Sequence, residues 1–491
     1  MMAAWRLVLL LSILIGQLSY GQSTPDPLLT KAESSNYQAT STHAEVMAFC
    51  KALATESPRV TLTTMGNSHE GRNLPLLIMS EHGISKPDDR LTVLCVGNIH
   101  AGEVCGKEAL MMLARDLARA DKPGILTNLN VLIAPIYNAD GNEPFHKDNR
   151  PGQVGPAHGM GQRANAEGLD LNRDYIKLEA PETRALVRLY REWDPSLVID
   201  THTTNGSQHR YTLTYGGPRH PATGGALVDY MRETFLPKVG EKLKASSGYN
   251  TFFYGNFADE HQRWETYPAL PRYGAHYLGL RQRLAILSEA YSYAPYKDRV
   301  LCTRDFVHEC LKLSAKRHKR LSKLVISARK KALKAPVALR HQLGPFDDKR
   351  LVKGKIDGEA KDFLLEYWGK SKATLSADQP YAYLIPANCA NIAANLQHHG
   401  IEVDELREDT HLTVHDYTLS GVERAEQPFQ KHHLVSIERA DSKKVRRQVP
   451  AGTLLVKTKQ DLGALAVFLL EPYSEDGLLT WNFMDEHLGE D

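Results

Sequence analysis

Four hydrophobic runs in this chain end in polar residues of the kinds that enzymes use for catalysis. LTVLCVGNIH reaches His100 and Glu103, NVLIAPIYNADG reaches Asn138 and Asp140, SLVIDTH reaches His202, and RLAILSE reaches Glu289. Short apolar runs with polar ends are typical of buried strands. Because ligands bind beyond the carboxyl ends of the strands in an open α/β sheet, we expect these polar residues to meet in one crevice.

Helical patterns separate these runs, at residues 103–120, 180–193 and 226–245. Strands that alternate with helices of this length predict an α/β fold with a mixed, largely parallel sheet and helices on both faces. Before them, residues 59–81 form short β-rich runs around Gly66 and Asn67, a pattern that predicts a hairpin leading into the sheet.

The composition changes after the last of these strands. Residues 305–335 form a strongly basic helical stretch that ends before Pro336, and residues 337–491 mix β-like runs with the helical pattern CANIAANLQHHG. We interpret the basic stretch as a solvated helix face rather than a site for an anionic polymer. The sequence therefore predicts a catalytic domain at residues 22–335 and a smaller α+β accessory domain at residues 336–491.

The first residues have the pattern of a secretory signal peptide. Arg6 precedes the apolar stretch from Leu7 to Ile15, and small residues follow at Ser19 and Gly21. The apolar stretch is shorter than the roughly 20 residues that a membrane span needs. We expect residues 1–21 to be removed and the chain to be exported, either secreted or periplasmic. An uncleaved N-terminal anchor is the alternative.

Charge and cysteine content narrow the range of partners. The net charge of +2 is small for 491 residues, which argues against a nucleic-acid partner, and no later segment is apolar enough to cross a membrane. Six cysteines are too few for a disulfide scaffold, and none forms a Cys-x-x-Cys pair. The spacing of Cys302 and Cys310 leaves a single disulfide between them open.

The residues at the strand ends match a known kind of metal site. Two histidines and one carboxylate form a zinc-ligand set that leaves a fourth position for water, and a further carboxylate can act on that water. His100, Glu103 and His202 are the candidate ligands, and Glu289 is the candidate general base. A lone His-x-x-Glu pair is a weak signal, but its position at a strand end strengthens it. The sequence thus predicts one zinc ion per chain.

The motifs NIHAGEVCGKEAL, PIYNADG, GLDLNRDY, DTHTTNGS and ILSEAY occur in one order over about 270 residues. In this order and content the chain resembles the zinc carboxypeptidases of the carboxypeptidase A/B type. The resemblance implies that His100, Glu103 and His202 bind zinc and that Glu289 is the general base and acid. It also implies that Asn172 and Arg173 bind the free C-terminal carboxylate of the substrate, for which a planar guanidinium is well suited.

Several positions depart from the family pattern. Asp174 stands where the family usually has asparagine, which would place a negative charge beside the bound carboxylate. Two arginines, Arg150 and Arg163, compete for the role of oxyanion donor, with Arg150 slightly ahead by its position in the sequence. The candidates for the mobile tyrosine are Tyr267, Tyr273 and Tyr277, of which we take Tyr273. The tail GALAVFLLEPYSEDGLLTWNFMDEHL resembles the end of an accessory domain found on some bacterial exported members.

The sequence is consistent with three functions. The first is a zinc metallocarboxypeptidase that acts on the C-termini of peptides or proteins. The second is a related zinc amide hydrolase that acts on cell-wall peptides or modified side chains, and Asp174 and the lack of a clear counterpart of the oxyanion arginine favour it. The third is a non-catalytic binding module, which the presence of all three ligands and Glu289 argues against, because each of the four is needed to activate water.

Overall fold

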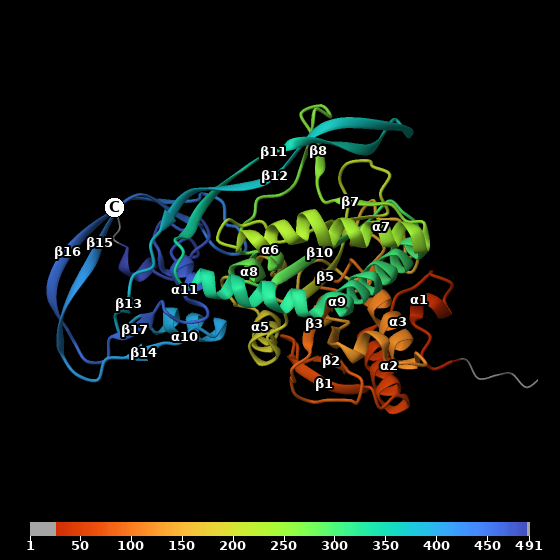
Figure 1. Cartoon of the computed structure of the whole chain (residues 1–491), viewed down its shortest axis with the longest axis horizontal. Coiled ribbons are helices and arrows are strands. Elements are labelled where there is room, and N and C mark those ends of the chain that lie inside the picture. Colours follow the sequence, from red (N-terminus) through yellow and green to blue (C-terminus); the bar gives the residue numbers. More distant parts are fainter. Residues whose placement is uncertain (1–25, 489–491) are drawn as a thin grey trace, which may run out of the picture.

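The computed structural model describes residues 26–488, so the predicted signal peptide lies outside the described residues. Figure 1 shows a central sheet covered by helices, with a β-rich region at the C-terminal end of the chain. The central sheet has the strand order β1-β2-β4-β3-β5-β10-β6-β7. Its strands are β1 (Val60–Asn67), β2 (Asn73–Met79), β3 (Leu91–Gly97), β4 (Leu129–Ala134), β5 (Leu197–Thr204), β6 (Leu213–Gly216), β7 (Thr251–Phe253) and β10 (Leu284–Tyr291).

The centre of the sheet is parallel. Strand β3 pairs in parallel with both β4 and β5, and β10 pairs in parallel with β5, whereas β1 with β2, β2 with β4, and β10 with β6 are antiparallel. Every residue of β3, β4 and β10 is buried, as expected for strands covered on both faces. The predicted mixed, largely parallel sheet and the predicted β1–β2 hairpin are confirmed.

The helices of the sheet domain are α1 (Lys31–Ser34), α2 (His43–Glu56), α3 (Cys105–Arg119), α4 (Ala139–Asn142), α5 (Pro181–Trp193), α6 (Gly225–Asp229), α7 (Leu236–Ser247), α8 (Gly274–Leu280) and α9 (Tyr296–Ala332). Helices α3, α7 and α9 pack together on one face of the sheet, whereas α8 lies against β5 and β10 on the other face. The basic stretch lies in the second half of α9 and carries the exposed lysines that the sequence predicted.

The helix predicted at residues 226–245 is interrupted. A π-helical turn, Tyr230–Phe235, separates α6 from α7. Pro237 lies in the first turn of α7. Because proline has no N–H and its ring clashes with the preceding turn, the regular hydrogen-bond pattern cannot continue through this position, and a π turn is one way to accommodate the break. The open question about Cys302 and Cys310 is also answered, since both are buried free thiols.

The C-terminal part is rich in strands. Its elements are β11 (Val337–Ile356), β12 (Glu359–Ala377), β13 (Ala382–Ile385), α10 (Ala390–His399), β14 (Asp404–Glu405), β15 (Thr410–Arg424), β16 (Val435–Val449), β17 (Leu454–Lys457), α11 (Gly463–Leu470) and a 3₁₀ turn at Asp485–His487. The short strands β8 (Asn256–Ala258) and β9 (Arg263–Glu265) and the 3₁₀ turns Gly124–Thr127 and Leu171–Arg173 lie before α9 in the chain. The long β11–β12 hairpin pairs with β9, so strands from before and after α9 form one sheet. The predicted domain limit at residue 335 remains a prediction.

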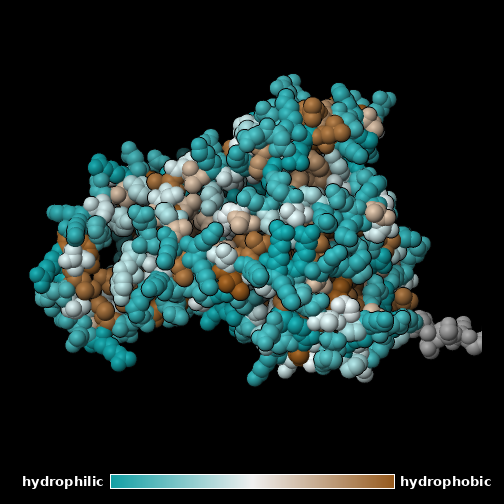
Figure 2. All heavy atoms as spheres, viewed as in Figure 1, coloured by the Kyte–Doolittle hydropathy of each residue, from teal (hydrophilic) through white to brown (hydrophobic). Residues whose placement is uncertain are grey.

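The β15–β16 hairpin is the most exposed part of this region. Figure 1 shows it as an arch at the left, and the space-filling view in Figure 2 shows a gap between this arch and the body of the molecule. Strands β13, β17 and β14 form a separate three-stranded sheet. Among the described residues, no helix has both the length and the hydrophobicity needed to cross a membrane.

A buried ion pair joins the sheet domain to the last residues of the chain. Arg272 donates from its backbone N–H and its Nε to the carboxylate of Asp476, at 2.6 and 2.9 Å. The indole of Trp481 donates to the same carboxylate at 2.9 Å, and the Arg272 guanidinium lies over the Trp481 ring. These bonds hold the C-terminal segment against Arg272, the residue that directly precedes Tyr273.

We predict that Arg272→Met lowers the free energy of unfolding by about 3–5 kcal/mol, because it leaves the Asp476 carboxylate buried without its cation. Urea unfolding at pH 7.5 measures the change. The matched control is Arg439→Met, which removes an exposed partner of Asp441 and should change stability by less than about 0.5 kcal/mol. Equal stability of the two variants would contradict the prediction.

A buried histidine makes stability depend on pH. His399, at the end of α10, contacts the hydroxyl of Tyr277 through Nδ1 at 2.8 Å and the carbonyl of Ile176 through Nε2 at 3.1 Å. Burial, together with the nearby positive charge of Arg281, lowers the pKa of His399 to about 3. The folded chain therefore keeps this ring neutral where the unfolded chain, with a pKa near 6.5, already binds a proton.

We predict that the stability contributed by His399 is fully present above about pH 6.5 and is lost as the pH falls below that value. The loss is at most about 1.4 kcal/mol per pH unit. Urea unfolding of the wild type and of His399→Gln between pH 7.5 and 4.5 measures it, since carboxylates affect both proteins alike. The variant should show the shallower pH dependence, and parallel curves would refute the prediction.

Candidate metal centre and active site

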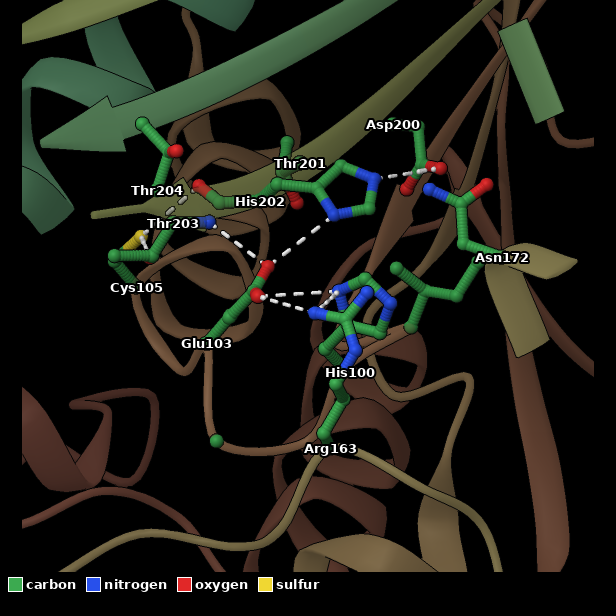
Figure 3. A network of polar contacts seen from close by, with 12 residues as sticks. His100, Glu103, Cys105, Arg163, Asn172, Asp200, Thr201, His202, Thr203 and Thr204 are labelled. Atoms are coloured by element: carbon green, nitrogen blue, oxygen red, sulfur yellow. Dashed lines mark hydrogen bonds and ion pairs between the residues drawn. The ribbon is translucent and has the colours of Figure 1, made fainter. Parts of the chain in front are cut away.

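The predicted ligands meet at the carboxyl ends of three central strands. His100 and Glu103 follow β3 directly, while His202 and Glu289 lie near the ends of β5 and β10. In the parallel pairing of β5 with β10, His202 and Glu289 are register partners. Figure 3 shows the two histidine rings on either side of the Glu103 carboxylate. The convergence predicted from these three strand ends is therefore seen in the structure.

The geometry of the three ligands suits a metal ion. Nδ1 of His100 lies 3.1 Å from one oxygen of Glu103, and Nδ1 of His202 lies 3.2 Å from the other. One possible ligand atom from each residue lies within 4.8 Å of the others, and all three side chains are buried. Two imidazoles and one carboxylate fit zinc and leave a position for water. Together, these side chains form the candidate zinc site.

The outer nitrogen of each histidine contacts a second carboxylate. Nε2 of His100 lies 2.9 Å from Asp170, and Nε2 of His202 lies 3.0 Å from Asp200. Such a contact places the proton on Nε2, so that Nδ1 keeps its lone pair for a metal. Asp170 and Asp200 were not identified from the sequence, although Asp170 lies within the motif GLDLNRDY and Asp200 is two residues before His202. These two histidine–carboxylate contacts are the observation that best supports a metal ion at this site.

A close approach explains the small residues between the first two ligands. The N–H of Glu103 donates to the carbonyl of His100, which closes the turn. A Cβ on Gly102 would lie 2.6 Å from Cγ of Arg150 and 2.7 Å from the carbonyl oxygen of Gly161. Glycine is thus required by the packing of this turn against two other loops.

The electrostatics of the site separate the roles of its carboxylates. Burial raises the pKa of the Glu289 carboxyl to about 7. Although burial also disfavours the charge of Asp170, the neighbouring His100 and Arg163 hold the pKa of its carboxyl well below the usual value. A carboxylate whose pKa is near neutrality can exchange a proton with substrate, whereas Asp170 stays ionised. Glu289 is therefore suited to proton transfer.

Both candidate arginines lie beside Glu103. Arg150 Nη2 lies 2.9 Å from the Glu103 carboxylate and donates to the carbonyl of Thr203 at 3.1 Å, and its side chain is mostly buried. Arg163 Nη1 lies 3.4 Å from Nδ1 of His100, and Nε donates to Asp170 at 2.9 Å. The Arg163 side chain is 41% exposed, against 15% for Arg150, so Arg163 is the more accessible of the two.

The predicted carboxylate-binding residues form one group. The Arg173 guanidinium lies over the Tyr273 ring at 4.5 Å and donates to the carbonyl of Asn172 at 2.8 Å. Asn172 Oδ1 accepts a hydrogen bond from the N–H of Gly274 at 2.9 Å. This bond ties the loop that carries Arg173 to the start of α8. Arg173 also lies 3.7 Å from Asp170, which connects the group to the candidate zinc site.

Asp174 does not face the bound carboxylate. Its side chain is fully buried, pairs with Lys177 at 3.0 Å and accepts hydrogen bonds from the N–H groups of Glu179 and Ala180. The charge is thus compensated inside the protein. The expectation that Asp174 places a negative charge in the substrate site was wrong, because the chain turns between Arg173 and the next residue.

Other candidates from the sequence have structural roles. Tyr277 is buried and its hydroxyl contacts His399 and Arg281, so it is not available as a mobile tyrosine. Asn138 accepts from the N–H of Gly141 at the start of α4, and Asp140 pairs with Ser68 and Arg72. The expectation that the end of β4 supplies groups to the crevice was wrong, because Asn138 caps α4 and donates to the carbonyls of Ile99 and Arg163, while Asp140 holds the Ser68–Arg72 turn.

Tyr254 lies close to the site and was not identified from the sequence. Its hydroxyl lies 3.5 Å from Thr204 Oγ1, two residues after His202. Burial, together with the negative charge of Glu289, raises the pKa of Tyr254 to about 12. Tyr254 thus stays protonated at neutral pH and can donate a hydrogen bond. It lies in the loop after β7, for which the sequence offered no motif.

A mixed α/β sheet with two histidines and two glutamates at its carboxyl edge defines a metal-dependent hydrolase. A family model described as zinc carboxypeptidase matches residues 46–278. Residues 46–278 are thus similar to zinc carboxypeptidases, and this match and the site geometry together support a metallopeptidase. The match covers β3, β5 and the three candidate zinc ligands, but ends before Glu289.

Two curated relatives show how far the likeness extends. Carboxypeptidase 2 of Trichophyton tonsurans is 21% identical over 453 residues, which cover 86% of this chain and 80% of that protein. Carboxypeptidase D of Rattus norvegicus is 30% identical over 195 residues, which cover 33% of this chain and 14% of that protein. The fungal likeness therefore extends beyond the family segment into the C-terminal part.

Two solved structures resemble part of the chain. A metallo-carboxypeptidase from Pseudomonas aeruginosa is 20% identical and covers 56% of this chain and 68% of that one, with a TM-score of 0.41. Carboxypeptidase A from Helicoverpa armigera is 18% identical and covers 57% of this chain and 75% of that one, with a TM-score of 0.42. The assignment rests on the family match and the site geometry, not on these partial likenesses.

We predict that Asp200→Asn weakens zinc binding by about 10- to 100-fold without unfolding the chain, because the amide no longer fixes the proton on Nε2 of His202. Competition with a chromophoric chelator measures the affinity. Asp148→Asn, at an exposed aspartate, is the matched control and should bind zinc as the wild type does. Unchanged affinity in the Asp200 variant would show that the Asp200 contact does not support a metal ligand.

Proposed function

We propose that this chain is a zinc-dependent exopeptidase that hydrolyses the C-terminal peptide bond of peptides, with Glu289 as general base. The observation that carries the proposal is the position of Arg173. Its guanidinium lies beside the Tyr273 ring and is linked through Asp170 to the candidate ligand His100. A free carboxylate bound by Arg173 would set the last peptide bond of the substrate near the ligand set.

The state of Arg173 supports this role. Its side chain is 22% exposed, and its closest polar partner is a backbone carbonyl rather than a carboxylate. A guanidinium with free N–H groups can bind a carboxylate through two parallel hydrogen bonds. The Tyr273 ring restricts the orientation of the guanidinium plane, so less conformational entropy is lost when a substrate binds.

The proton transfers follow from the position of Glu289. Zinc, when bound by His100, Glu103 and His202, lowers the pKa of a coordinated water and polarises a carbonyl. The Glu289 carboxylate accepts the proton of the attacking water and then passes it to the nitrogen of the leaving residue. A pKa of about 7 suits both transfers. Near neutral pH the ionised form is present to accept a proton, and the protonated form is acidic enough to donate it.

The negative charge that develops on the carbonyl oxygen needs a donor. The accessibility of Arg163, together with its position 3.4 Å from Nδ1 of His100, favours it over Arg150 for this role. The Nη2 group of Arg150 already donates to the carbonyl of Thr203. We therefore assign the oxyanion to Arg163 and a structural role at Glu103 to Arg150. Removal of such a donor typically costs on the order of a hundredfold in rate.

The related amide hydrolase remains the alternative, but the buried position of Asp174 removes one reason for it. One zinc ion per chain is proposed because the second cluster of similar composition, His220, His341 and Glu475, directs N–H groups rather than lone pairs at its carboxylate. Export is proposed from the pattern of residues 1–21 alone. Peptide C-termini are the proposed partners.

We predict that the zinc-loaded chain hydrolyses N-blocked dipeptides with a free C-terminus and leaves the matching C-terminal amides intact. Glu289→Gln should lower kcat/KM by about a hundredfold or more, because the neutral amide cannot accept the proton. Chromatography of the released amino acid measures both rates.

The control for Glu289→Gln is its zinc content, which should equal that of the wild type. Equal hydrolysis of acids and amides would contradict the exopeptidase and favour the amide hydrolase. Undiminished activity of the glutamine variant would contradict the assignment of the general base.

A further inference from the structure

The tip of the β15–β16 hairpin, Phe429–His432, touches the loop that carries Asp170. Oε1 of Gln430 accepts a hydrogen bond from the backbone N–H of Asp170 at 2.8 Å. Asp170 contacts Nε2 of His100, and the predicted carboxylate-binding pair Asn172 and Arg173 lies two and three residues further along the chain. A residue 260 positions away in the sequence therefore lies against the part of the site that would receive the end of the substrate.

The tip has an unfavourable backbone conformation. Gln430 and Lys431 have φ values of 52° and 68°, and the backbone groups of Phe429 and His432 bond each other on either side. A two-residue turn with both φ values positive is best made by Asn-Gly, since other side chains meet the backbone there. Glutamine and lysine at these positions store strain, and such strain is often found where residues bind a ligand.

Several contacts hold the tip in place. Nε2 of His432 contacts Glu179 at 2.6 Å, and Nδ1 contacts Asn482 at 2.9 Å. The Phe429 ring lies near the Trp481 ring, and the Arg272 guanidinium lies over both. Because Arg272 immediately precedes Tyr273, the tip and the carboxylate-binding group share one support.

The free end of the Gln430 side chain is available for a ligand. Within residues 26–488, its amide nitrogen donates no hydrogen bond, although its oxygen is fixed by Asp170. The side chain is neutral and half-buried. An anchored amide with a free N–H pair can donate to a carbonyl or carboxylate oxygen. Its anchor lies beside Arg173, where the terminal residue of a peptide would bind.

We propose that the hairpin tip, Phe429–His432, forms one wall of the pocket for the substrate's C-terminal residue, with Gln430 as a residue that positions that residue. This inference rests on the proposed function. The C-terminal region thereby becomes part of the binding site, and the terminal side chains that the enzyme accepts depend on the tip.

The test uses the full chain with Glu289→Gln, in which the expected hundredfold slower hydrolysis leaves time to measure peptide binding. Calorimetry measures the affinity of an N-blocked dipeptide acid, and bound zinc is quantified in parallel. Adding Gln430→Ala should weaken binding about five- to tenfold, the effect of one lost hydrogen bond. The matched control is Gln427→Ala, an exposed glutamine on the same loop that should leave affinity unchanged.

A second variant separates binding from folding. Gln430→Asn with Lys431→Gly gives the turn its preferred residues, so the melting temperature should rise while the affinity falls. Unchanged affinity in both Gln430 variants would overturn the proposal. Loss of zinc together with affinity would also overturn it, because Gln430 would then act only through Asp170.

Failure of the exopeptidase proposal would look different. In that case, the Glu289→Gln chain with an unchanged tip would bind dipeptide acids and dipeptide amides equally well, or the wild type would cleave the amides. The comparison of Gln430→Ala with Gln427→Ala would still decide whether the tip contacts the peptide. Both variants are measured with the same peptide, and they differ only in whether the lost glutamine lies at the tip or elsewhere on the loop.

Discussion

The active-site geometry depends on the parallel pairing of β5 with β3 on one side and β10 on the other. This register places His202 directly beside Glu289, and Thr201 beside Gly97 at the end of β3. Side chains alternate between the two faces of a sheet, so a slip by one residue would turn His202 or Glu289 to the opposite face. Every residue of β3 and β10 is buried, so the site rests on a part of the sheet that is covered on both faces.

The parts of the fold that follow from local patterns could be predicted from the sequence. Apolar runs gave the central strands, and polar residues at their ends gave His100, Glu103, His202 and Glu289. The break after α6 was missed because it depends on Pro237 within an otherwise helical pattern. The role predicted for Asp174 was wrong because its side chain turns inward to pair with Lys177. Nothing in the sequence indicated this buried pair.

Contacts between distant segments could not be predicted. Gln430 meets Asp170 only because the C-terminal region folds back onto the sheet domain, and nothing in either segment indicates the other. Asp200 was similarly missed, since an aspartate inside an apolar run has many possible partners. Single residues in known motifs were thus predictable, whereas the supports of those residues come from packing between elements.

A second cluster shows why composition alone does not define a metal site. His220, His341 and Glu475 have the same two-histidine, one-glutamate composition as the candidate zinc site, and one possible ligand atom from each lies within 4.8 Å of the others. They come from the segment after β6, from β11 and from the C-terminal segment, so they join three parts of the chain. The distances alone do not distinguish this cluster from the first.

The protons distinguish the two clusters. At the candidate zinc site, carboxylates face the outer nitrogen of each histidine and leave Nδ1 unprotonated towards Glu103. In the second cluster, the outer nitrogens accept backbone N–H groups, from Ala222 to Nδ1 of His220 at 3.2 Å and from Ala269 to Nε2 of His341 at 3.0 Å. A neutral imidazole that accepts at one nitrogen carries its proton on the other.

The nitrogens that face Glu475 in the second cluster are therefore donors and have no lone pair for a metal. Nε2 of His220 lies 3.4 Å from the carboxylate, and Nδ1 of His341 is closer still. Two N–H groups directed at one carboxylate stabilise its charge, and although burial opposes this, the pKa of Glu475 is lowered to about 2. The cluster thus joins the C-terminal segment to the sheet domain through hydrogen bonds, and this attachment helps to hold Trp481 and the hairpin tip beside the active site.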